Sequence, residues 1–183
     1  MKNNKLRISI AGEIFSGKTT IAKLLASETK YNYVSMGGIF RDEAKRKHLT
    51  VMELSKIYES NPELDIKLDE TLLGLTDANS IIVDGRMGWY FLKDSVKIYL
   101  KASQETKIER VLSANGKDLE NFKSGKEAVE HLENRRASEN CRYTTAYGVE
   151  IGNESNYDLV IDTTNKTVRG VLTDILEYLD GLE

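Results

Sequence analysis

The sequence is poor in the residues that build disulfide or metal scaffolds. Its 183 residues include one cysteine, Cys141, and two histidines, His48 and His131. One cysteine cannot form an internal disulfide, and it agrees with a reducing cytoplasm, where we expect the protein. The two histidines share no metal-ligand spacing with each other or with the cysteine. A disulfide framework and a zinc-type centre are therefore not expected.

Long apolar runs and an excess of one charge are lacking as well. The chain carries 26 basic and 29 acidic residues, a net charge of −3, which gives no general attraction to polyanions. No apolar stretch is long enough for a signal peptide or a membrane span. We expect small-molecule partners, no nucleic acid, no membrane and a monomer.

Five apolar runs predict β-strands, and helical patterns separate them. Because strands and helices alternate, the sequence predicts an α/β fold in one domain, a parallel five-stranded sheet with helices on both faces. Ligands of such sheets bind at the carboxyl ends of the strands. The predicted strands are 6–11, 32–35, 80–84, 96–102 and 158–162.

The strongest motif follows the first predicted strand. Residues 12–20 read Gly-Glu-Ile-Phe-Ser-Gly-Lys-Thr-Thr, the form G-x-x-x-x-G-K-[ST] of a phosphate-binding loop, and a helical pattern follows. Backbone N–H groups of such a turn bind phosphate oxygens, helped by the positive end of the helix. The residues expected to bind ATP are Gly12, Glu13, Ile14, Phe15, Ser16, Gly17, Lys18, Thr19 and Thr20.

Two charged residues end the third predicted strand. Asp84 closes the run Ile81-Ile82-Val83-Asp84, and Gly85-Arg86 follows at once. Behind a phosphate-binding loop, such a carboxylate is a candidate for holding Mg²⁺ through water. We expect the Thr19 hydroxyl to be a direct ligand of the same ion.

A charged stripe lies on the predicted helix near residue 140. Arg135, Glu139 and Arg142 are spaced i, i+4 and i+7, so they share one helical face. A surface ladder of ion pairs would have this spacing. Behind a phosphate-binding loop, the arginines could instead clamp a transferring phosphate, and both interpretations stay open.

A second pair of interest, Asp65 and Asp69, lies four residues apart on the helix that Pro62 begins. A carboxylate can accept a hydrogen bond from the amino group of cytosine, which uracil lacks. Alternatively, both acids simply suit the first turns of a helix, where negative charge is favourable.

Taken together, these residues resemble the nucleoside monophosphate kinases, and most closely the short, archaeal-type cytidylate kinases. The resemblance covers nearly the whole chain and rests on fragments in a fixed order. They are residues 12–20, Val34-Ser35-x-Gly37-x-Ile39-Phe40-Arg41, Asn61-Pro62-Glu63-Leu64-Asp65, Asp84-Gly85-Arg86, Leu100-Lys101-Ala102, Arg135-x-x-Ser138-Glu139-x-x-Arg142-Tyr143, Tyr147-Gly148 and Tyr157-Asp158-Leu159-Val160-Ile161.

The resemblance implies transfer of the γ-phosphate of ATP to CMP or dCMP, giving CDP or dCDP, with Mg²⁺ as cofactor. It implies a P-loop NTPase-type core (1–35, 79–113, 151–183), an acceptor-binding subdomain (36–78) and a lid (114–150). Lys18, Arg135 and Arg142 would be catalytic. Acceptor-binding residues would be Ser35, Gly37, Arg41, Asp65, Asp69, Arg86 and Glu139, with Thr19 and Asp84 at the metal.

Some positions depart from the family. Phe15 stands where many such loops have glycine, Gly38 where an acid is common, and Ala114 where arginine is frequent. After Asp69, the residues Glu70-Thr71-Leu72 replace the usual basic residues and glutamine. Two other functions are therefore weighed: a kinase of another nucleotide or small metabolite, and a nucleotide-binding module with impaired catalysis.

Overall fold

The computed structural model describes residues 6–75, 80–113 and 124–182, and its centre is a five-stranded parallel sheet. The strands are β1 (Arg7–Gly12), β2 (Asn32–Ser35), β3 (Ile81–Asp84), β4 (Val96–Lys101) and β5 (Leu159–Asp162). Each agrees with a predicted strand to within one residue at either end. Their order in the sheet is β2-β3-β1-β4-β5.

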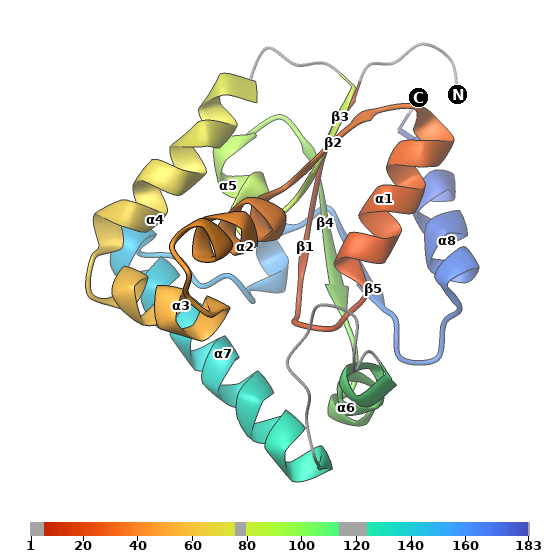
Figure 1. Ribbon diagram of the computed structural model, residues 1–183. Helices are drawn as coiled ribbons and strands as arrows, with labels where there is room; N and C mark the ends of the chain where they lie inside the picture. Colours follow the sequence, from red (N-terminus) through yellow and green to blue (C-terminus); the bar gives the residue numbers. More distant parts are fainter. Residues whose placement is uncertain (1–5, 76–79, 114–123, 183) are drawn as a thin grey trace.

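Helices cover both faces of this sheet (Figure 1). On one face lie α1 (Lys18–Thr29) and α8 (Val168–Asp180), which pack onto the sheet through Leu25 and Ile175. On the other lie α2 (Met36–Arg46), the 3₁₀ helix η1 (Glu70–Leu75) and the short α5 (Gly88–Phe91), which meet the sheet around Leu72. The strands are apolar runs because both faces are buried.

The remaining helices lie beyond α2 and beyond the carboxyl ends of the strands (Figure 1). They are α3 (Val51–Glu59), α4 (Pro62–Asp69), α6 (Gln104–Ser113) and the long α7 (Gly125–Tyr147), with the short η2 (Glu154–Asn156) beyond. Along its length α7 contacts α6, α3 and α4 in turn. It therefore runs beside the carboxyl ends of the strands, as Figure 1 shows.

The chain reverses its direction of travel across the sheet at β1, the middle strand. After β1 it builds β2 and β3 on one side, then crosses to build β4 and β5 on the other. Crevices at such a switch point are where open α/β sheets bind ligands. The register aligns Ser35 with Asp84 and Gly12 with Leu100, so the carboxyl ends of the strands lie together.

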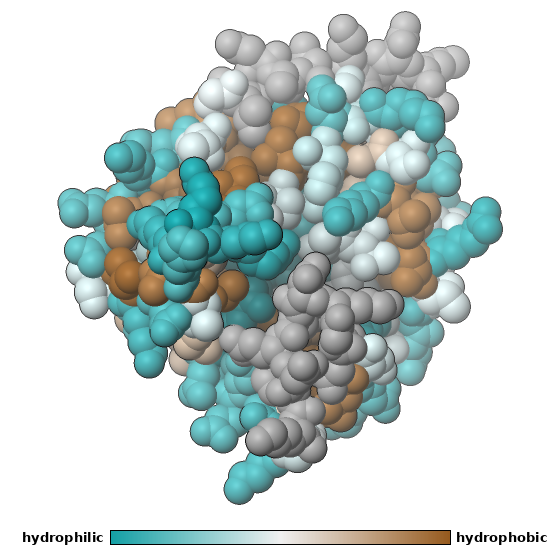
Figure 2. All heavy atoms as spheres, in the orientation of Figure 1, coloured by the Kyte–Doolittle hydropathy of each residue, from teal (hydrophilic) through white to brown (hydrophobic). Residues whose placement is uncertain are grey.

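The surface of the described residues is mixed in character. On the face drawn in Figure 2, polar side chains spread widely, and apolar ones gather in separate patches between them. Among the helices of the described ranges, not one is both long and apolar enough to cross a membrane. The start predicted for the lid, including Ala114, lies outside the described residues.

Candidate active site

The backbone at the start of the phosphate-binding loop requires a glycine. Gly12 has φ of 145°, and a Cβ there would meet the carbonyl oxygen of Leu100 at 2.1 Å. The next amide, that of Glu13, donates to the same carbonyl at 2.9 Å. Only glycine fits this approach between β1 and β4, so the loop leaves the sheet at a fixed angle and reaches α1 at Lys18.

Phe15 occupies a backbone conformation that glycine usually supplies. Its φ is 58°, in the left-handed region that costs a side chain about 1–2 kcal/mol. Phe15, which replaces the usual glycine, therefore keeps the positive φ that glycine would adopt at this position. Its side chain packs beside the cluster of Ile14, Val111 and Leu132, which offsets the strain by apolar contact.

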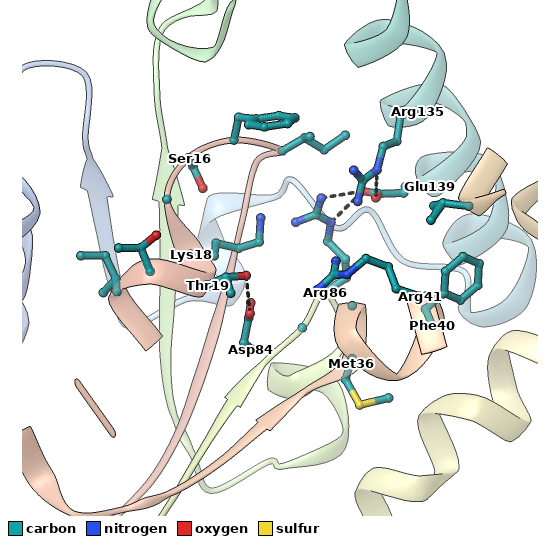
Figure 3. A pocket seen from close by; sticks show the side chains of 18 of the residues that line it. Ser16, Lys18, Thr19, Met36, Phe40, Arg41, Asp84, Arg86, Arg135 and Glu139 are labelled. Carbon is teal, nitrogen blue, oxygen red and sulfur yellow. Dashed lines mark hydrogen bonds and ion pairs between the residues drawn. The ribbon is translucent and has the colours of Figure 1, made fainter. Parts of the chain in front are cut away.

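Two hydroxyl groups, one from the phosphate-binding loop and one from β2, meet at Asp84 at the end of β3. The Thr19 hydroxyl donates to Asp84 at 2.6 Å, and the Tyr33 hydroxyl donates to the same oxygen at 3.2 Å. A hydroxyl and a carboxylate at this distance are the hard oxygen donors that Mg²⁺ prefers. The predicted metal residues therefore lie together, as Figure 3 shows, and they fit the ion that the resemblance implies.

Lys18 points into the same space (Figure 3). Its ammonium donates to the carbonyl oxygen of Glu13 at 2.6 Å. Burial lowers the pKa of Lys18 well below its usual value, and the nearby charge of Arg86 lowers it further. An anionic phosphate would relieve both effects, since it would pair the ammonium and offset the neighbouring guanidinium.

Glu139 joins two of the predicted arginines. Arg86 donates to Glu139 from Nε at 2.7 Å and approaches it from a terminal nitrogen at 2.6 Å, while Arg135 donates from Nε at 3.2 Å. Burial tends to raise the pKa of Glu139, but the two guanidinium groups hold it at about 2. The carboxylate is therefore ionised and keeps both arginines facing the loop, as drawn in Figure 3.

Arg142 has a different partner from the rest of the stripe. Its guanidinium makes a bidentate pair with Asp65, at 2.9 and 2.5 Å, and the two side chains are only 5% and 1% exposed. Phe40 and Tyr58 place their rings 4.8 and 5.1 Å from the same guanidinium. The stripe is therefore not an exposed ladder of ion pairs. Arg142 joins α7 to α4, and its guanidinium is not free to face the phosphate-binding loop.

Arg41 is the most accessible of the four predicted arginines. It is exposed on α2, and within the described ranges no ion pair engages it. Its guanidinium lies beside Gly37, where an added Cβ would meet it at 3.3 Å. Ser35 caps this helix by accepting from the amide of Gly38 at 3.1 Å. The positive helix end and Arg41 together favour an anion at this point.

Asp69 is a buried carboxyl, 3% exposed, that accepts from the Tyr147 hydroxyl at 2.9 Å. Burial raises the pKa of Asp69 to about 7, the Tyr147 bond opposes this, and neighbouring Asp65 adds to it. The folded protein therefore retains a proton on Asp69 in a pH range where the unfolded chain has lost it.

This retention predicts that stability falls as pH rises between about 4 and 7. The unfolded chain binds fewer protons in that window. The free energy of unfolding therefore falls by at most about 1.4 kcal/mol for each pH unit. We expect Asp69→Asn to flatten this slope in urea unfolding at several pH values. Asp180→Asn, an exposed change on α8, is the control. Equal slopes in wild type and Asp69→Asn would contradict the assignment.

Arg110 is a site residue that no sequence motif predicts. Arg110 on α6 donates to the carbonyl of Phe15 at 3.1 Å and to the hydroxyl and carbonyl of Thr163 at 3.0 and 2.9 Å. Thr163 in turn donates to the carbonyl of Ser16 at 3.1 Å. Arg110 therefore braces the phosphate-binding loop against the end of β5. Its sequence context, an amphipathic helix, gives no signal for this role.

Most of these groups line one cavity of about 760 Å³. The loop and α1 form one end, with Lys18 and Thr19. The other end is built from α2, α3, α4 and α7, and it includes Arg41, Asp69 and Arg142. Most of the predicted donor and acceptor residues therefore meet at one cavity, although they come from distant parts of the chain. Gly12, Glu13, Ser35 and Asp65 are not among the residues that line it.

The sheet order, the loop and this cavity define a P-loop kinase fold. A shikimate kinase from Bacteroides thetaiotaomicron superposes with a TM-score of 0.64, covering 96% of this chain and 98% of that one, at 14% identity. At that identity the likeness concerns the fold alone.

The sequence comparisons define the family more closely. Residues 7–165 match the Cytidylate kinase-like family. The cytidylate kinase of Archaeoglobus fulgidus is 32% identical over 177 residues, which are 96% of this chain and 95% of the relative. That of Pyrobaculum aerophilum is 33% identical over 173 residues, 93% and 91% of the two chains. The chain belongs to the cytidylate kinase-like family.

Proposed function

We propose that this protein is a nucleoside monophosphate kinase that transfers the γ-phosphate of ATP to CMP or dCMP. The observation that carries the proposal is the shared cavity. A phosphate-binding loop with Lys18 stands at one end, Arg86 lies against that loop by donating to the carbonyl of Gly12, and Arg41 lies at the helix end of α2. A kinase whose acceptor is an uncharged hydroxyl compound would have little use for arginines facing the acceptor's position.

The chemistry asks mainly for position and charge. Lys18 and the amide groups at the start of α1 hold the ATP phosphates. Thr19 and, through water, Asp84 would hold Mg²⁺, which when bound supplies charge neutralisation on the phosphate oxygens. Arg41 and Arg86 orient the attacking phosphate, and Arg135 stabilises charge as the phosphoryl group passes.

The division into moving parts is also part of the proposal. The acceptor-binding subdomain would be 36–78 and the lid 114–150, on a core of the remaining residues. Closure would exclude water, which otherwise would hydrolyse ATP. The protein would act on free nucleotides in the cytoplasm as a monomer.

The test is ADP release measured with CMP, dCMP, UMP, AMP and GMP, and with small hydroxyl acceptors. The proposal expects CMP or dCMP to give the highest kcat/KM. A hydroxyl acceptor as the best substrate would indicate a metabolite kinase. ATP binding without transfer to any acceptor would indicate a nucleotide-binding module.

Arg41→Ala and Arg86→Ala are expected to weaken acceptor binding at least tenfold and ATP binding far less. A hydrogen bond to a charged group contributes about 1.5–3 kcal/mol, which is more than tenfold in affinity. The two ligands are titrated separately by calorimetry. Arg46→Ala, an exposed change on the same helix α2, is the control for Arg41. An equal fall in both affinities would remove these arginines from the acceptor site.

A further inference from the structure

Three hydroxyl groups meet a single oxygen of Asp84, the carboxylate at the end of β3. Its Oδ2 accepts from Thr19 at 2.6 Å, from Tyr33 at 3.2 Å and from Ser35 at 3.5 Å. The other oxygen, Oδ1, has no hydrogen-bond partner among the described residues. Asp84 is 4% exposed and lines the cavity. The carboxylate is therefore anchored through one oxygen, and the second oxygen is left for a ligand.

The sheet brings Tyr33 to this carboxylate. β2 and β3 pair in parallel, with Tyr33 opposite Ile82 and Ser35 opposite Asp84. Because side chains alternate along a strand, Tyr33 and Ser35 share one face of the sheet. The Tyr33 ring packs against the core cluster that contains Ile82 and Leu25, while its hydroxyl reaches Asp84. Packing of the ring therefore fixes the place of the hydroxyl.

The direction of these hydrogen bonds decides what the site can offer to a cation. A hydroxyl has one proton and two lone pairs. Because Thr19 gives its proton to Oδ2 of Asp84, its lone pairs are free for the ion that it is expected to bind. A carboxylate held at Oδ2 presents Oδ1 to water of that ion, whereas a carboxylate that is not held could rotate away.

Tyr33 and Ser35 differ in how cleanly each serves this purpose. The Ser35 bond, at 3.5 Å, is at the limit for a hydrogen bond. The same hydroxyl accepts from the amide of Gly38 at 3.1 Å, where it caps α2. Tyr33 is closer to Asp84, at 3.2 Å, and it caps no helix. A change at Tyr33 therefore removes a bond to Asp84 without disturbing α2.

We propose that Tyr33 is a positioning residue of the Mg²⁺ site. Its hydroxyl holds Oδ2 of Asp84 where Thr19 can donate to it, which leaves Oδ1 for water of the ion and the lone pairs of Thr19 for the ion itself. This inference rests on the Mg²⁺ site of the proposed function. Tyr33 is not among the residues that line the cavity, so it acts through Asp84 and not on the nucleotide.

Tyr33→Phe is the direct test, because it removes the hydroxyl and keeps the ring. The measurement is the affinity of Mn²⁺, used in place of Mg²⁺, for the complex of the protein with ADP, with free Mn²⁺ measured by electron paramagnetic resonance. Loss of an outer partner of a metal ligand typically weakens metal binding about 10–100-fold. Since Asp84 would reach the ion through water, we expect a smaller loss, of at least about threefold. The affinity for ADP in EDTA is expected to be unchanged.

Two further variants complete the design, each with a melting curve. Tyr33→Leu removes both the hydroxyl and the ring, and it is expected to weaken Mn²⁺ binding as much as Tyr33→Phe does. Tyr31→Phe is the matched control. Tyr31 packs against the same core cluster, but its hydroxyl accepts from the amide of Leu6 at 3.4 Å. The control is expected to bind Mn²⁺ like wild type.

The outcomes separate this inference from the proposed function. A smaller fall than expected in Tyr33→Phe, or an equal fall in Tyr31→Phe, overturns the role of Tyr33 and leaves the kinase proposal standing. A fall in Tyr33→Leu alone assigns the effect to packing of the ring and also overturns it. If the wild-type complex binds Mn²⁺ no more tightly than free ADP does, the proposed metal site is wrong and this inference falls with it.

Discussion

Lys18→Ala is expected to remove nearly all phosphoryl transfer, by about 10²–10³-fold or more, while the protein still folds. Lys18 places its ammonium between the loop and the arginines, and its only hydrogen bond among the described residues goes to the carbonyl of Glu13. Burial and the charge of Arg86 both lower the pKa of Lys18 and so disfavour its charged form. Its removal therefore costs the fold little and costs the transition state a charge that nothing replaces.

The measurement is steady-state ADP release, accompanied by a melting curve for each variant. Lys23→Ala is the matched control, since Lys23 is an exposed lysine on the same helix α1. The control is expected to match wild type in both measurements. A Lys18→Ala variant that melts normally and turns over within tenfold of wild type would end the kinase interpretation.

Arg142→Ala is expected to lower the free energy of unfolding by about 3–5 kcal/mol. The change leaves Asp65, 1% exposed, as a buried carboxylate without its partner, and removing one partner of a buried ion pair carries a cost of this size. Asp65→Ala is expected to cost a similar amount, because the guanidinium of Arg142 would then be left unpaired. Urea unfolding at 25 °C measures both.

The exposed pair Lys166–Asp174 is the control for this prediction. Its side chains are 45% and 36% exposed, and exposed pairs contribute only about 0–1 kcal/mol. Replacing both Asp65 and Arg142 by apolar residues of similar volume is expected to restore much of the loss. If Arg142→Ala unfolds like wild type but its turnover falls about a thousandfold, Arg142 is the catalytic clamp that its spacing first suggested.

The sheet could be predicted because its strands are short apolar runs that break sharply at polar residues. The strand Ile81–Asp84, for example, is buried along its whole length and reads as an unbroken apolar run up to its final carboxylate. The helix Val51–Glu59, in contrast, is not among the predictions, although Thr50 and Glu53 form a capping box that the sequence displays. The amphipathic stripe there is brief, so this start signal is the main local sign of the helix.

The site could be predicted as a set of residues but not as a set of pairs. The spacing of Arg135, Glu139 and Arg142 places them on one helical face, yet it says nothing about what faces them. Arg142 meets Asp65 across 77 positions of sequence, and Arg86 meets Glu139 across 53. These partners can be identified only once the packing of α7 against α4 and beside the end of β3 is known.

If α7 rotates as the site closes, the ion pair between Arg142 and Asp65 is its fulcrum, because that pair ties the helix to α4. At 1.5 Å per residue, Arg135 lies about 10 Å from that fulcrum and Gly125 about 25 Å. A rotation of the helix about Arg142 would therefore move the start of α7 about two and a half times as far as it moves Arg135. A wide swing at the outer end of the helix would then produce only a small adjustment of the guanidinium beside the phosphates.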